Sequence, residues 1–92
     1  MRVKVRFLLW LAEKAGKDGV ELDIKDTSET ALHSVLLELA RSKPQLSRVV
    51  EDILLGRSDV IILVNLKTPS RGLETPIREG DEIALMPPVS GG

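Results

Sequence analysis

The chain has 92 residues, enough for one domain, and its single Phe, single Trp and absence of Tyr predict an aliphatic core. Its 13 basic and 14 acidic side chains nearly cancel and form no basic run, which argues against a nucleic-acid partner. The sequence has no cysteine and only one histidine, His33. It therefore excludes disulfides, thiolate metal sites and a thiol nucleophile, and predicts no metal site.

The first residues alternate between charged and apolar side chains, which predicts a half-buried strand over residues 2–7. Residues 8–11 break this alternation, and residues 12–16 are predicted to form a turn. Residues 19–25 alternate again and predict a second strand, so that the chain opens with a hairpin. A secretory signal would need an unbroken apolar stretch here, and no segment approaches the roughly 18 apolar residues of a membrane span. We therefore expect a cytoplasmic protein without a membrane partner.

Helical spacing dominates the middle of the chain. Asp26 with Glu29 fits a capping box, and the apolar residues between 32 and 40 recur at i, i+3, i+4 and i+7, which predicts a helix that ends near Arg41, before Pro44. The same spacing over residues 46–54 predicts a short second helix, with Gly56 as its stop.

The last third alternates between strand and turn signals. The β-branched run at residues 59–65 predicts a central strand. Residues 66–77 predict turns around one short edge strand, residues 79–81 a turn, and residues 82–86 a final strand stopped by Pro87-Pro88.

This element order predicts an α+β fold: a mixed sheet with one main helix across one face and a short second helix, which is the β-grasp, or ubiquitin-like, arrangement. Strands from both ends of the chain would pair in the middle of the sheet. We expect a β-grasp domain over residues 1–86 and a flexible tail over residues 87–92. The predicted core between sheet and helix comprises Val5, Phe7, Leu36, Leu39, Ile62, Val64 and Ile83.

The charged and polar side chains give no sign of catalysis. No pair of residues resembles a general acid and base, His33 is expected at the edge of the helix surface, and Asn65 suits the turn after its strand. Gly91 and Gly92 contribute nothing to packing and are costly to order, but a backbone without Cβ atoms can enter a narrow channel. Pro87 and Pro88 favour an extended base for the tail. The predicted working part is therefore the tail, Pro87, Pro88, Val89, Ser90, Gly91 and Gly92, with the Gly92 carboxylate as its reactive group.

The ending over residues 79–92 resembles that of the ubiquitin-like sulfur carriers, the family that includes the molybdopterin synthase small subunit (MoaD) and the thiazole-synthesis carrier ThiS. Residues 72–77 and 7–16 resemble the family's segment before the last turn and its first strand with the following loop. The chain departs from the family at Leu66, where Gly often occurs soon after the Asn, and at Leu85-Met86, where aromatics are common.

The resemblance implies that the chain is not an enzyme by itself. A MoeB-like activating enzyme would use MgATP to adenylate the Gly92 carboxylate, and a sulfur donor protein would then replace AMP, leaving a thiocarboxylate. No tightly bound cofactor is implied. In molybdopterin synthesis the catalytic residues belong to a MoaE-like large subunit, with which the carrier forms a heterotetramer.

Three alternatives remain open. The sulfur could go to thiazole or to tRNA instead of molybdopterin. The activated tail could instead be captured by lysines, which would make the chain a protein modifier joined by isopeptide bonds. Finally, the chain could be a non-covalent binding module whose tail has no role.

Strand alternation also predicts a partner surface. If Ile83 faces the helix, Met86 must face outward, and the same logic leaves Ile61 and Leu63 outside. We expect Leu8, Leu63 and Met86 to form an exposed apolar patch near the base of the tail that binds partners.

Overall fold

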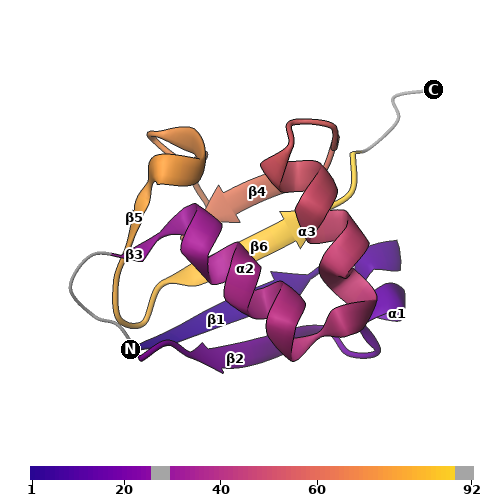
Figure 1. The fold of residues 1–92 in the computed structure, drawn as a ribbon, viewed down its shortest axis with the longest axis horizontal. Coiled ribbons are helices and arrows are strands. Elements are labelled where there is room, and N and C mark those ends of the chain that lie inside the picture. The colour runs from indigo at the N-terminus through magenta and orange to yellow at the C-terminus, as the bar shows by residue number, and fades with distance from the viewer. Residues whose placement is uncertain (26–29, 89–92) are drawn as a thin grey trace.

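A computed structural model describes residues 1–25 and 30–88. Its main sheet has four strands in the order β2-β1-β6-β4 (Figure 1). Strand β1 (Arg2–Phe7) is antiparallel to β2 (Gly19–Asp23) and parallel to β6 (Glu82–Met86), which in turn is antiparallel to β4 (Ile61–Val64). The mixed sheet and its two central strands from opposite ends of the chain confirm the β-grasp prediction.

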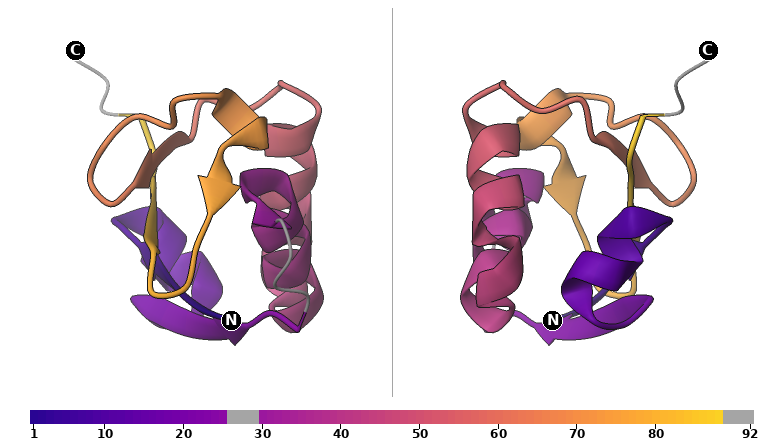
Figure 2. Two further views of the ribbon diagram at one scale, coloured as in Figure 1. Left: turned by 90° about the vertical axis from the view of Figure 1, so that its left-hand side faces the viewer. Right: turned by 90° about the vertical axis from the view of Figure 1, so that its right-hand side faces the viewer.

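Two helices form a layer on one side of this sheet (Figure 2). Helix α2 (Leu32–Ser42) is followed by a 3₁₀ turn, η1 (Pro44–Leu46), and by α3 (Ser47–Leu54). In the apolar stripe of α2, Leu32, Val35, Leu36 and Leu39 are fully buried, and Ala40 is half-buried against the core, which confirms the helix face predicted from its spacing. These two helices are the predicted main helix and short second helix.

Alternation places the core between the two layers. Val3, Val5 and Phe7 of β1 are buried, while the charged residues between them are exposed. Of the seven predicted core residues, five are fully buried: Val5, Phe7, Leu36, Leu39 and Ile83. Ile62 and Val64 pack against the core but are only half-buried.

The half-burial of those two residues follows from the position of their strand, which differs from the predicted one. Strand β4 lies at an edge of the sheet and is not a central strand. Strands β1 and β6 occupy the centre because each is hydrogen-bonded on both sides. An apolar run of β-branched residues is therefore compatible with an edge position when one face packs on a core and the other carries an apolar surface.

The predicted turn at residues 12–16 is also wrong. Residues Trp10–Ala15 form helix α1, and Gly16 ends it in the left-handed conformation, with its N–H directed to the carbonyls of Ala12 and Glu13. The spacing that the sequence interpretation missed is that of Leu11 and Ala15, four residues apart, which are both buried. The opening strands still pair as predicted, with this helix in the connection between them.

A second, smaller sheet joins segments that are distant in sequence. Strand β3 (Thr30–Ala31) pairs with β5 (Pro76–Ile77), which follows the 3₁₀ turn η2 (Gly72–Glu74); β5 is the predicted short edge strand. Helix α2 starts directly after β3, with Ala31 as its N-cap residue. The predicted capping box at Asp26 and Glu29 lies outside the described residues.

Candidate functional site

Strand β6 carries the predicted tail out of the centre of the sheet. Ile83 and Leu85 face the helices and are fully buried, and β6 is paired along both of its edges. Pro87 is also buried, whereas Pro88 is exposed. The first residue of the predicted tail is therefore packed against the domain. Val89, Ser90, Gly91 and Gly92 lie outside the described residues.

The predicted patch residues lie on the outer face of the sheet, opposite the helices. In the β4–β6 register Ile61 is opposite Met86 and Leu63 is opposite Ala84. Leu8 extends β1 beside β6, since its N–H donates to the Leu85 carbonyl at 3.1 Å. The structure thus brings Leu8, Leu63 and Met86 to one side of the tail's base, and all three are half-buried. Whether this surface binds a partner stays a prediction.

Ile61 is a residue of this surface that the patch prediction omitted, although the alternation in the sequence already placed it outside. It is 37% exposed and directly opposite Met86, nearer to the tail's base than Leu63 is. Ala84 is aligned with Leu63 in one neighbouring strand and with Arg6 in the other, and it is buried. We call Leu8, Ile61, Leu63 and Met86 the outer patch.

Charge on the outer face increases away from the tail. Lys4 and Glu82 are paired in the β1–β6 register, and the Arg6 guanidinium lies 3.4 Å from a Glu82 carboxylate oxygen. The face therefore changes from charged at the start of β6 to apolar at its end. The apolar part of this face is thus the part nearest to Pro87, at the base of the tail.

The start of β6 is fixed by a side-chain network around Asn65. The Asn65 amide N–H donates to Asp81 at 3.0 Å, and its amide oxygen accepts the Glu82 backbone N–H at 3.0 Å. Asn65 and Leu66 both have positive φ, and Val64 and Lys67 exchange two backbone hydrogen bonds around them, as in a two-residue hairpin turn. Asn65 is thus a structural residue, as the sequence analysis interpreted it.

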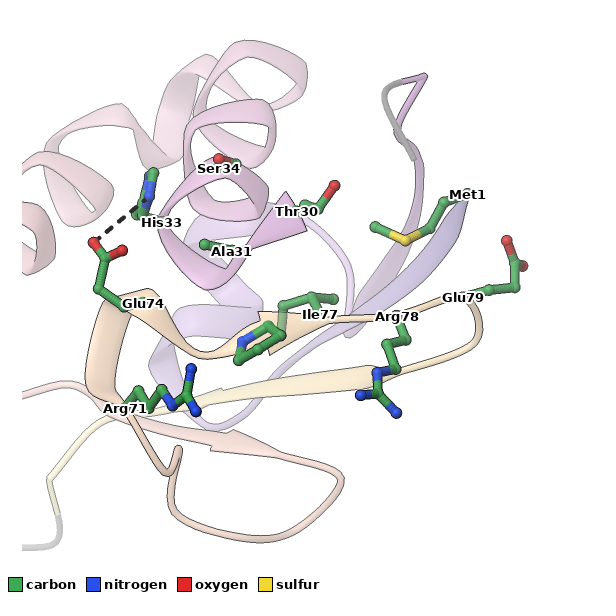
Figure 3. A pocket seen from close by; sticks show the side chains of 11 residues that line it. Met1, Thr30, Ala31, His33, Ser34, Arg71, Glu74, Ile77, Arg78 and Glu79 are labelled. Carbon is green, nitrogen blue, oxygen red and sulfur yellow. Dashed lines mark ion pairs between the residues drawn. The ribbon is translucent and has the colours of Figure 1, made fainter. Parts of the chain in front are cut away.

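A groove lies at the end of the molecule away from the tail's base (Figure 3). It runs between the start of α2 and the β3–β5 sheet, and Arg71, Arg78 and Glu74 contribute charges of both signs to its lining. His33 lies at its rim, with Nε2 3.8 Å from a Glu74 carboxylate oxygen. This mixed lining does not resemble a catalytic constellation.

The polar side chains in the rest of the described chain are paired or exposed. Within residues 1–25 and 30–88 no group of three or more His, Asp or Glu side chains is arranged to hold a metal ion, and no buried side-chain polar atom lacks a partner. The shifted pKa values belong to an exposed pair on α2, where a hydrogen bond from Arg41 lowers the pKa of the Glu38 carboxyl. No helix in the described part of the chain is long and apolar enough to cross a membrane.

Comparisons with known proteins agree with this geometry. The ThiS family profile matches residues 5–92. The molybdopterin synthase sulfur carrier subunit of Dictyostelium discoideum is 33% identical over 89 residues, which span 97% of this chain and 94% of that protein.

Two solved structures show the same fold over the full length of both chains. One is small archaeal modifier protein 1 from Haloferax volcanii, with 29% identity and a TM-score of 0.78. The other belongs to a protein–protein complex of subunits 1 and 2 of the molybdopterin-converting factor from Helicobacter pylori, with 26% identity and a TM-score of 0.62.

Proposed function

The chain belongs to the ThiS family of ubiquitin-like sulfur carriers, and from this premise we propose that it carries sulfur as a Gly92 thiocarboxylate, as the small subunit of a molybdopterin synthase. The observation that carries the proposal is the way β6 presents the tail. A fully paired central strand ends in buried Pro87 and exposed Pro88, and Val89, Ser90, Gly91 and Gly92 follow in the sequence. A rigid body that ends in a residue pair without Cβ atoms suits delivery of a carboxylate into a narrow active site.

Activation is needed because a carboxylate is a poor electrophile. An α-carboxyl group has a pKa of about 3.3–3.7 and is ionised at neutral pH. In the proposed reaction a Gly92 carboxylate oxygen attacks the α-phosphorus of MgATP, and pyrophosphate leaves. A persulfide sulfur on a donor protein then attacks the carbonyl carbon of the acyl-adenylate, so that a C–S bond forms and the C–O bond to AMP breaks. A second thiol of the donor attacks the resulting acyl disulfide, which leaves the thiocarboxylate on Gly92 and a disulfide on the donor.

A persulfide would have to be held by another protein, because this chain has no cysteine. The thiocarboxylate sulfur then attacks a carbon of the acceptor and displaces the leaving group of that carbon, which gives a thioester. Water attacks the Gly92 carbonyl carbon and breaks its C–S bond, so that the sulfur stays on the acceptor and the Gly92 carboxylate returns. Among the described residues none forms an acid–base pair near the base of the tail. We therefore assign adenylation to a MoeB-like enzyme and sulfur insertion to a MoaE-like large subunit, with the carrier as a non-catalytic subunit of a heterotetramer. The Helicobacter pylori complex supports a partner subunit of this kind.

Intact mass spectrometry of the protein isolated from its host tests the thiocarboxylate directly. The proposal predicts a species about 16 Da heavier than the chain, the difference between sulfur and oxygen. This species should disappear in a host that lacks the adenylating enzyme. To identify the pathway, the carrier gene is deleted: loss of molybdoenzyme activity supports the molybdopterin role, whereas thiamine auxotrophy or unthiolated tRNA would assign the sulfur elsewhere.

A second candidate function is protein modification, favoured by the likeness to small archaeal modifier protein 1. In this role a lysine amine attacks the adenylated or thiolated Gly92 carbonyl and forms an isopeptide bond, while AMP or hydrogen sulfide leaves. Trypsin would cut after Arg78 and leave residues 79–92 on the modified lysine. Recovery of such branched peptides from the host would establish this role, and a thiocarboxylate without branched peptides would exclude it.

A further inference from the structure

Leu9 combines a strained backbone with an exposed side chain. Its φ is 57° and its ψ is −132°, the angles of the first central residue of a type II′ turn, a position that Gly dominates. The Leu11 N–H donates to the Leu8 carbonyl at 3.2 Å and closes this turn. The Leu9 side chain is nevertheless 64% exposed. A large apolar residue at this position has two costs in the isolated chain. Its backbone is strained, and its apolar side chain is exposed to water.

Trp10 follows directly and is 49% exposed, although it is the chain's only tryptophan. Helix α1, which Trp10 begins, is firmly seated: Leu11 and Ala15 are fully buried, and the Gln45 side chain donates to the Ala15 carbonyl at 3.0 Å. The two exposed side chains therefore project from a rigid support. We call this feature the Leu9–Trp10 turn.

The strand register places the Leu9–Trp10 turn beside the base of the tail. Phe7 is aligned with Leu85 in the parallel β1–β6 pair, and the bond from the Leu8 N–H to Leu85 continues the alignment toward Pro87. Figure 1 shows α1 at the end of the sheet toward which β6 points. A protein that receives the tail must approach this end of the molecule.

We propose that Leu9 and Trp10 dock onto an apolar surface of the adenylating enzyme, beside the channel that takes the tail. This assignment rests on the proposed function. The adenylating enzyme is the partner that both the sulfur-carrier and the modifier roles require, since each begins with adenylation of Gly92. The contact would compensate the strain of Leu9 and cover the exposed face of Trp10, next to the outer patch but on a different element.

The test is ATP–pyrophosphate exchange by the host's adenylating enzyme, with Leu9→Gly as the variant. Gly fits the observed backbone angles, so the variant should fold without a fall in melting temperature while it loses the side chain. We expect the KM for the carrier to rise about tenfold, the scale of one interface anchor, with kcat unchanged because the tail is intact. Leu66→Gly is the matched control. Leu66 is also an exposed leucine at positive φ, but it lies at the opposite end of the sheet from the tail's base, so its variant should keep the wild-type KM.

A second measurement does not depend on any variant. With 5-fluorotryptophan in place of Trp10, the single fluorine resonance should shift when unlabelled adenylating enzyme is added. An unshifted resonance together with an unchanged KM for Leu9→Gly would overturn the inference and leave the proposed function standing. Absence of exchange with the wild-type carrier would instead refute the proposed function and this inference with it. A dimer of the wild-type carrier in sedimentation that Leu9→Gly dissolves would overturn the assignment in favour of a second copy.

Discussion

The most direct test of the outer patch is Met86→Asp. Met86 is the last residue of β6, half-buried, with Ile61 opposite it and Leu8 on the other side. Complete burial of a methionine side chain contributes about 1.5–3 kcal/mol, so covering the exposed half on docking should contribute about 1 kcal/mol. With an aspartate at this position, the contribution of the covered methionine would be lost, and removing the carboxylate from water would cost about 1–3 kcal/mol more. We therefore expect binding to the large subunit to weaken by at least about 1.4 kcal/mol, or tenfold.

Isothermal titration calorimetry against the large subunit measures this change, and a thermal melt checks the fold. The inward neighbours of Met86 in β6 are unaffected, so the melting transition should stay cooperative. Leu37→Asp is the matched control, because Leu37 is 54% exposed on α2, in the helical layer on the other side of the sheet. Equal affinity of a folded Met86→Asp protein and the wild type would refute the docking role of the outer patch.

Three further predictions concern the tail, the core and the Asn65 network. Removal of Gly91 and Gly92 should leave the melting temperature unchanged and abolish ATP–pyrophosphate exchange; full exchange by the truncated chain would refute the proposed function. Leu39→Ala, at a fully buried position of α2, should lower the free energy of unfolding by about 2–5 kcal/mol in urea denaturation, and a near-neutral value would mean that the helix face packs otherwise. Asn65→Ala should lower the free energy of unfolding by about 1–3 kcal/mol, since it removes two hydrogen bonds and leaves Ala at positive φ. It should not change the KM of the carrier in ATP–pyrophosphate exchange, because Asn65 lies at the opposite end of β6 from the tail.

The local patterns of this sequence were sufficient where an element is long enough to repeat its pattern along one buried face. The alternation in β1 and the 3.6-residue spacing in α2 each describe a single buried face, and both were predicted from sequence. The same reasoning identified the final strand and its stop at the prolines. The ending over residues 79–92 was enough to indicate the family. The chemistry of the tail depends on a short segment, the two terminal glycines after the prolines, and such a segment can be recognised in the sequence.

Tertiary structure decided what depends on neighbours distant in sequence. The apolar run at residues 61–64 is typical of a central strand. Because β1 pairs with β6 in the centre of the sheet, this run instead lies at an edge. Helix α1 is too short for its spacing to be distinctive, and its stability comes from burial of Leu11 and Ala15. Leu9 and Trp10 appear in the sequence as part of an apolar run. Their exposure beside the tail's base follows from the strained turn and the parallel register, which no local pattern encodes.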